Sequence, residues 1–243
     1  MERFLKVESI ILNRKVSKLD KLLFVFTREK GKLLVIAPGS VKLPNRFGGA
    51  IEPLNYGLMS IYYSVGSNFY LKEFDVKNSF LSVRGSLKRL RSSLSFFSLL
   101  NKLLPYEAPE AKLFDITLDF LNLLEEGSDP LLLELVVSLK AFDLLGFLPK
   151  LDTCSYCSGK ISKEAFIKVE GPFLLCRSCS EANGLRIGAE GIALLGEIQK
   201  MPLAFFKDLR YNLKGLKEAS LYLKILSEKV VGGVRFEFSG IDI

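Results

Sequence analysis

Four cysteines in two Cys-x-x-Cys pairs constrain this 243-residue chain more than any other feature of its sequence. Cys154 and Cys157 form the first Cys-x-x-Cys motif, Cys176 and Cys179 form the second, and eighteen residues separate the two motifs. Each pair places two sulfur atoms in one tight turn, and two such turns supply the ligands of a tetrahedral site. Residues 166–175 read as a hairpin that would bring the turns together. We therefore predict one structural zinc ion held by four thiolates, which leave no position open for water or substrate.

Three other states of the cysteines fit the same spacing: a redox-active dithiol, two disulfides, or four buried thiols without metal. Residues 1–8 contain no uninterrupted apolar stretch and do not resemble a secretory signal. No apolar run approaches the 18 residues typical of a membrane-spanning helix. We expect a cytoplasmic, nucleoid-associated protein, and the reducing surroundings favour the metal site over disulfides.

The absence of histidine excludes several classes of catalytic site. Without histidine, the chain cannot build a Ser-His-Asp or Cys-His nucleophile, nor a metal site with imidazole ligands. The sequence contains no Gly-x4-Gly-Lys-Ser/Thr phosphate loop and no acidic pair typical of a two-metal centre. We therefore expect a protein that is not an enzyme.

The first 80 residues carry the pattern of a small β-barrel. Short β-prone runs separated by turn residues predict five strands, at residues 4–12, 22–27, 33–36, 58–65 and 69–76. Five short strands in such a length are typical of the OB-fold, a Greek-key barrel that often binds nucleic acid. Residues 1–80 are thus predicted to form an OB-fold domain that binds nucleic acid.

Helical periodicity begins near residue 82 and continues through most of the remaining chain. Leu87, Leu90 and Leu94 mark the expected buried face of the first helix. Ser128-Asp129-Pro130 is a helix start signal for residues 131–145. Further helices are expected at residues 114–124, 189–200 and 204–230, with a strand at 234–238. The predicted fold is a multidomain α+β chain, in which a helical domain of residues 81–243 contains a zinc module at 152–182.

The charge balance indicates an anionic partner. The chain has 34 Lys and Arg against 27 Asp and Glu, a net charge of +7, and residues 1–80 alone hold 13 basic and 7 acidic residues. Two groups of candidate residues for binding nucleic acid follow, one in the barrel domain and one at the first helix. In the barrel they are Arg14, Lys15, Lys18 and Lys21 in the connection of the first two strands, with Lys42 and Arg46 in a later loop.

At the start of the first helix the candidates are Arg84, Lys88, Arg89 and Arg91, where basic residues oppose the helix dipole and so are not explained by helix stability. A possible second basic surface has helical spacing and consists of Lys207, Arg210, Lys214, Lys217 and Lys224. For each of these groups the alternative is plain solvated surface charge, and for the second basic surface the two interpretations are equally well supported.

Aromatic side chains accompany the basic residues of the barrel domain. They are Tyr56, Tyr62, Tyr63, Phe69 and Tyr70. Aromatic rings beside cations are the usual means of binding single-stranded nucleic acid. The alternative is that the rings fill the barrel core, and the sequence leaves both interpretations open.

This combination resembles the RecO family of bacterial recombination mediators over nearly the whole chain. The most specific segments are residues 26–32 (Phe-Thr-Arg-Glu-Lys-Gly-Lys), the loop of residues 39–53 with Arg46-Phe47-Gly48-Gly49, and the cysteine module. The resemblance implies a protein that binds single- and double-stranded DNA and anneals complementary strands. It also implies that the protein acts together with RecR and contacts the acidic C-terminal tail of single-strand-binding protein. In this role it would assist the loading of RecA onto single strands coated by that protein.

Other functions fit the same composition. An RNA-binding protein of translation or the ribosome also combines OB barrels with four-cysteine modules. A purely structural adaptor would use the zinc module as a protein interface and would lack salt-dependent binding of nucleic acid. A zinc hydrolase or deaminase is disfavoured by the saturated thiolate site.

Overall fold

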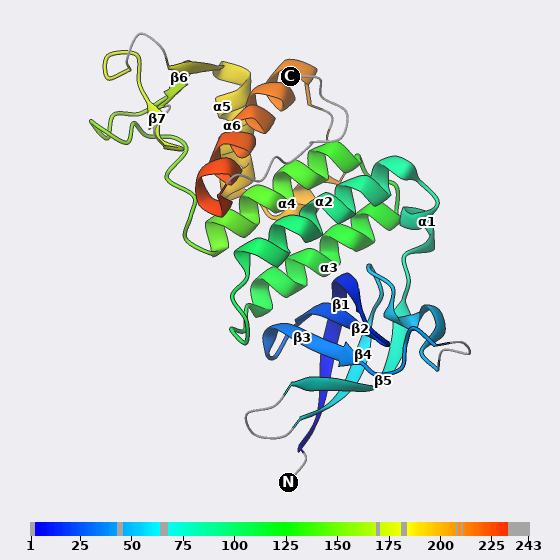
Figure 1. Ribbon diagram of the computed structural model, residues 1–243. Coiled ribbons are helices and arrows are strands. Elements are labelled where there is room, and N and C mark those ends of the chain that lie inside the picture. Colours follow the sequence, from blue (N-terminus) through cyan, green and yellow to red (C-terminus); the bar gives the residue numbers. More distant parts are fainter. Residues whose placement is uncertain are drawn as a thin grey trace. The chain divides into compact units, whose positions relative to one another are not determined.

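The computed structural model describes residues 3–42, 46–63, 68–168, 171–180, 184–207, 209 and 211–232. The chain divides into two compact units, residues 1–125 and 126–243. The first contains a β-barrel and three helices, and the second contains three helices and a small sheet with the cysteines (Figure 1). The prediction of an α+β chain is confirmed. The division at residue 80 lies within the first unit and stays a prediction.

Five strands close the barrel in the order β1-β2-β3-β5-β4, which confirms the expected five-stranded barrel of OB type. Their bounds are β1 Arg3–Ser17, β2 Asp20–Thr27, β3 Gly31–Ala37, β4 Tyr56–Tyr63 and β5 Phe69–Asn78. All neighbours pair antiparallel except β3 and β5, which are parallel. A short 3-10 helix, η1 Gly48–Ile51, buries Ile51 in the barrel core.

Alternation along the strands separates the barrel core from its outer face. Val25, Val35 and Ile61 are completely buried inside, as side chains at every second position of a strand point to the same face. The interior contains the aliphatic side chains that burial stabilises.

Three helices complete the first unit: α1 Leu81–Arg84, α2 Leu87–Leu103 and α3 Ala111–Glu125. Figure 1 shows α3 lying over the barrel, and Phe114 of α3 meets Phe26 of β2 edge to face at 5.4 Å between ring centroids. The expected buried face of α2 is wrong at its start, because Leu87 and Leu94 are 72% and 42% exposed, although Phe97 and Leu100 at the same spacing are buried. Ser92, Ser93 and a group of later apolar residues face inward instead, namely Phe96, Phe97, Leu99, Leu100 and Leu103.

The second unit begins with α4 Pro130–Leu144, as the start signal predicted. The Asp129 carboxylate accepts hydrogen bonds from the backbone N–H groups of Leu131 and Leu132 at 2.9 Å and caps the helix. Helix α5 spans Ala189–Lys200, and its first turn is capped by the carboxylate of Glu218, which accepts from the N–H of Gly188 and Gly191.

The helix expected at residues 204–230 is two separate elements, η2 Leu203–Phe206 and α6 Leu213–Val231. The Asn212 side chain accepts from the N–H of Lys214 at 2.7 Å and so begins a new helix. A strand at 234–238 was also expected, and those residues lie outside the described part of the chain. Within that part, none of the helices combines the length and the apolar character needed to cross a membrane.

Candidate functional site

Two turns and a hairpin bring the four cysteines together in the second unit. Strands β6 Glu164–Ile167 and β7 Leu174–Leu175 pair antiparallel, which confirms the expected hairpin, and β8 Leu185–Gly188 pairs with the other edge of β6. The N–H of Ser155 donates to the carbonyl of Leu174 at 2.9 Å and ties the first cysteine turn to β7. The second turn directly follows β7, because Cys176 is the next residue.

The sulfur atoms of Cys154, Cys157, Cys176 and Cys179 all lie within 4.8 Å of one another. The Sγ atoms of Cys157 and Cys176 are 3.8 Å apart, which is far longer than a disulfide bond. Four sulfur ligands at these separations can surround a single metal ion. The described residues contain no other group of three or more His, Cys, Asp or Glu side chains in such an arrangement.

The electrostatics of the cluster also suit a cation. Burial raises the pKa of Cys154, but backbone N–H groups of Cys157, Cys176 and Tyr156 outweigh it and lower the pKa to about 6. Hydrogen bonding with the other thiols, Cys176 first, raises the pKa of Cys179. One thiolate is thus stabilised by the turn, whereas four adjacent thiolates need a bound positive charge.

The barrel is the second candidate site, and its basic residues are placed differently from the prediction. Arg14 and Lys15 lie within β1, Lys21 lies within β2, and the connection is a two-residue turn at Lys18 and Leu19. The expectation of a basic loop between the first two strands is therefore wrong, because β1 is longer than its apolar pattern indicates.

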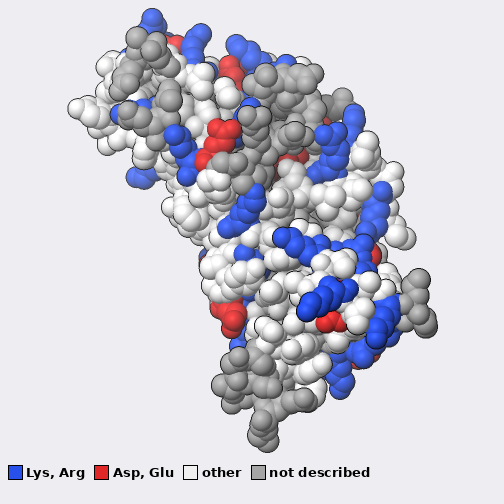
Figure 2. Space-filling model, viewed as in Figure 1, with Lys and Arg blue, Asp and Glu red and all other residues white. Residues whose placement is uncertain are grey.

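Lys15, Lys18 and Lys42 are exposed, whereas Lys21 is half-buried. Arg14 forms an ion pair with Glu52 at 2.8 Å. Figure 2 shows one face of the molecule, on which Lys and Arg gather over the barrel with few Asp or Glu among them.

Arg46 is exposed, stacks over the Phe47 ring at 4.5 Å, and donates to the carbonyl of Lys72 at 2.6 Å. Its guanidinium is thus held beside β5.

The basic residues at the first helix do not share one face. Arg84 ends α1, and Gly85 and Ser86 separate it from α2. The half-buried Arg84 guanidinium donates to the carbonyls of Ser79 and Pro53 and to the side chain of Asn55. Arg84 therefore fastens α1 to the loop before β4, which corrects the expectation that positions 84, 88 and 91 form one helical face.

Lys88 and Arg91 are exposed on α2, and Arg89 donates to the hydroxyl of Ser82 at 2.6 Å. In the second unit, Lys214, Lys217 and Lys224 lie on α6, but Lys207 follows η2 and forms an ion pair with Glu126 at 2.7 Å. The five-residue stripe on one helix is therefore wrong. Arg210 lies outside the described residues.

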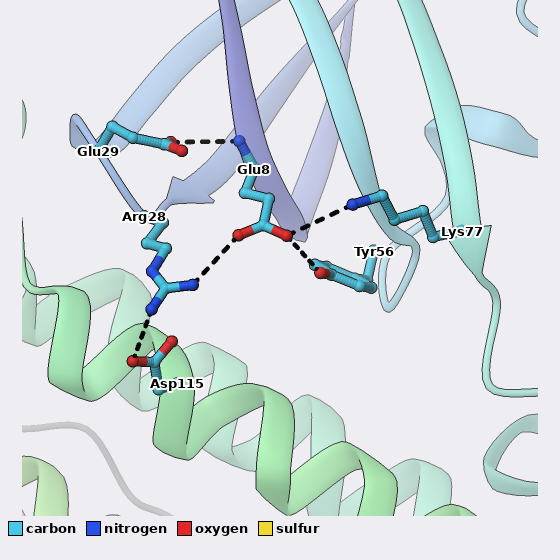
Figure 3. A network of polar contacts seen from close by, with 6 residues as sticks. All are labelled: Glu8, Arg28, Glu29, Tyr56, Lys77 and Asp115. Carbon is cyan, nitrogen blue, oxygen red and sulfur yellow. Dashed lines mark hydrogen bonds and ion pairs between the residues drawn. The ribbon is translucent and has the colours of Figure 1, made fainter.

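A polar network joins the barrel to α3, and two further basic residues, Arg28 and Lys77, form ion pairs within it (Figure 3). The Glu8 carboxylate of β1 accepts from the hydroxyl of Tyr56 at 2.6 Å and pairs with Arg28 at 3.4 Å and Lys77 at 3.5 Å. Arg28 also reaches Asp115 of α3 at 3.1 Å. The Tyr56 hydrogen bond, with Arg28 and Lys77, lowers the pKa of Glu8 against the effect of burial. Burial first, then Glu8, raises the pKa of Tyr56 to about 12.

The aromatic residues of the barrel divide among three roles. Phe69 packs against the barrel core and contacts Tyr63 at 5.3 Å, and Tyr56 belongs to the network with Glu8. Tyr62 and Tyr70 stack on each other outside the core at 5.3 Å between centroids. Sequence reasoning missed Phe4 and Lys6, although their alternation with the buried Val7 places both on the outer face of β1.

Comparison with known proteins decides the family. The model described as "Recombination protein O N terminal" matches residues 1–80, and "Recombination protein O C terminal" matches residues 84–234. The chain belongs to the RecO family. A RecO relative from Halalkalibacterium halodurans is 30% identical, covering 99% of this chain and 92% of that protein. One from Exiguobacterium sibiricum is 27% identical, covering 98% and 93%. Both carry the description "DNA repair protein RecO".

Proposed function

We propose that the chain is a non-enzymatic recombination mediator in DNA repair. It binds single- and double-stranded DNA and anneals complementary strands. With RecR it assists the loading of RecA onto single strands coated by single-strand-binding protein. The observation that carries the proposal is a closed OB-type barrel with exposed lysines in a chain of the RecO family.

Annealing requires only that the charges of two phosphate backbones be neutralised, so that they no longer repel, while the bases stay free to pair. Exposed lysines and arginines supply this neutralisation without any catalytic group. We assign most of this neutralisation to four residues of the barrel domain, Lys15 and Lys18 near the β1–β2 turn together with Lys42 and Arg46. Lys88 and Arg91 on α2 rank second. Arg14, Lys21, Arg84 and Arg89 take a smaller part, since they are paired or half-buried.

The four cysteines hold one structural Zn²⁺ in this proposal. Four sulfur ligands suit zinc and saturate its tetrahedral coordination. The metal would stabilise the module that contains β6 and β7 by on the order of 10 kcal/mol, because its four ligands come from two turns that the ion holds together. The cysteine ligands thus serve folding rather than chemistry.

The acidic tail of single-strand-binding protein requires a basic surface. Lys214, Lys217 and Lys224 on α6 form our candidate for this second basic surface. RecR and RecA are further partners that the family resemblance implies.

The experiment is annealing of two complementary oligonucleotides, first bare and then coated with single-strand-binding protein, read by fluorescence quenching at two salt concentrations. Acceleration of both, weaker at high salt, supports the mediator. Acceleration of bare strands alone would indicate a general cationic annealer. No acceleration would contradict the proposal and favour RNA binding or an adaptor.

A variant tests the assigned lysines. Lys15→Gln combined with Lys18→Gln should lower the salt slope of single-strand binding by roughly 1.4, about 0.7 for each phosphate that is no longer neutralised. Lys160→Gln with Lys163→Gln is the matched control, because both of these lysines are exposed on the cysteine module. An unchanged slope would move the interface to Lys88 and Arg91.

A further inference from the structure

A continuous row of apolar and aromatic side chains crosses the outer face of the barrel near one end. The strand register sets it directly: Phe4 lies opposite Tyr62, and Tyr62 lies opposite Tyr70. Tyr70 in turn lies opposite Ile36, and Ile36 opposite Leu22. None of the five belongs to the barrel core. The row therefore uses one outward residue from every strand of the barrel.

The aromatic half of the row presents planar rings to solvent. Phe4 is 59% exposed, and its ring centroid lies 6.2 Å from that of Tyr62. Tyr62 and Tyr70 are half-buried and nearly parallel, with an interplanar angle of 19°. Three large rings side by side in this position contribute little to the stability of the fold, since the core lies on the other side of the sheet.

Cations lie at both ends of the row. Lys72 places its Nζ 5.0 Å from the centroid of the Phe4 ring, and Lys6 follows two residues after Phe4 on the same face of β1. At the other end, Lys15 lies opposite Leu22 in the register.

Few acidic groups interrupt this pattern. Glu73 is exposed next to Lys72, and Asp20 near Leu22 accepts a hydrogen bond from the N–H of Gly39 at 2.7 Å. A ligand that fits this surface has flat apolar faces and regularly spaced negative charges.

We propose that the row of Phe4, Tyr62 and Tyr70 stacks the unpaired bases of single-stranded nucleic acid, while Lys6, Lys72 and Lys15 contact its phosphates. Each base has an aromatic face that stacks on such rings whatever its sequence. A duplex gains nothing from the rings, because its bases are already stacked inside. This inference rests on the proposed function and gives the barrel a means of preferring single strands.

The test compares leucine and phenylalanine at the two tyrosines. Tyr62→Leu with Tyr70→Leu keeps the apolar character and removes the rings, whereas Tyr62→Phe with Tyr70→Phe keeps the rings. We expect the leucine variant to bind an oligo(dT) single strand at least about tenfold more weakly at fixed salt, and the phenylalanine variant to bind like the wild type. The salt slope should stay unchanged, because the rings displace no counterions.

An abasic oligonucleotide of equal length and charge isolates the stacking. Wild type and leucine variant should bind it equally well, and Tyr156→Leu, at an exposed tyrosine of the cysteine module, should leave oligo(dT) binding unchanged. Phe4→Leu repeats the test if the double variant does not fold, because Phe4 is largely exposed.

Equal binding of oligo(dT) by the leucine variants and by the wild type would overturn the proposal that the row stacks bases. An equal weakening on oligo(dT) and on the abasic strand would also overturn it, and would leave a protein partner as the occupant of the row. If the wild type binds neither strand in a salt-dependent way, the proposed function itself fails.

Discussion

At the scale of single residues, Glu8 organises the junction of the barrel and α3. It gathers a tyrosine hydroxyl, an arginine and a lysine around one carboxylate, and Arg28 carries the network on to Asp115 (Figure 3). A carboxylate held by such partners stays ionised in the folded chain at a pH where it would be protonated in the unfolded chain.

We predict that Tyr56→Phe destabilises the chain by about 1.5 to 3 kcal/mol at pH 7, the range for a hydrogen bond to a charged group. The folded pKa of Glu8 is lowered, so its contribution is present above the unfolded pKa and is lost as the pH falls through the folded pKa. The difference between wild type and variant should therefore shrink below the usual titration range of glutamate. Urea unfolding across pH measures this.

Tyr156→Phe is the control for this prediction, because it removes a hydroxyl from an exposed ring. A Tyr56→Phe deficit that is the same at pH 7 and at acid pH would show that the hydroxyl does not act through Glu8.

The four cysteines and Arg84 show what could and could not be predicted from the sequence at this scale. The types and spacing of Cys154, Cys157, Cys176 and Cys179 were sufficient to predict that their sulfur atoms cluster. The role of Arg84 was not predictable, because its partners Pro53 and Asn55 are 31 and 29 positions away in the sequence. Chain folding alone brings an arginine to distant carbonyls.

At the scale of elements, the β2–β3 turn depends on a glycine. Gly31 has a φ of +69°, and a Cβ atom there would lie 1.9 Å from the carbonyl oxygen of Ala108. The chain after α2 passes directly over this turn, where the N–H of Glu107 donates to the carbonyl of Lys32 at 2.9 Å. Both the conformation and the close approach require the absence of a side chain.

We predict that Gly31→Ala destabilises the first unit by about 3 kcal/mol or more, since left-handed strain alone costs about 1 to 3 kcal/mol and the clash adds to it. Gly49→Ala is the matched control: a Cβ there meets nothing within 4 Å, and the change should stay within about 0.5 kcal/mol. Urea unfolding followed by circular dichroism measures both. Equal stability of the two variants would contradict the close approach.

Helix α2 shows the limit of periodicity at this scale. Leu87, Leu90 and Leu94 have helical spacing, yet Leu87 and Leu94 are exposed. Phe97 and Leu100 continue the same spacing and are buried, so the pattern predicts the helix but not which part of its apolar stripe is covered by tertiary contacts.

At the scale of the whole molecule, the barrel and the cysteine module depend on different kinds of stabilisation. The first buries aliphatic side chains inside a closed barrel. The cysteine module has a three-stranded sheet, in which β7 is two residues long and β6 and β8 are four each. Most of the described residues among 152–182 lie in turns outside these short strands, so we expect a metal ion to supply much of the module's stability.

We predict that removing the metal with a strong chelator under reducing conditions unfolds residues 152–182 and leaves the barrel intact. Hydrogen exchange should rise in β6 and β7 and stay unchanged in β1–β5. Elemental analysis should find one equivalent of zinc per chain before chelation. Cys157→Ser should show the same exchange pattern without chelator. A metal-free protein from a reducing preparation, with β6 already protected, would refute the zinc site.

Local patterns in the sequence were sufficient to predict the properties that depend on neighbours along the chain. These include the β-prone runs of the barrel, the start of α4 at Asp129-Pro130, and two cysteine pairs close enough to share one ion. The local patterns did not predict which basic residues remain exposed and which rings lie outside the barrel. Both depend on strand register and on contacts between distant segments, as when Tyr62 meets Tyr70 across two strands while Tyr63 turns toward Phe69. One position along a strand changes the face that a side chain occupies, and the local pattern does not fix that position.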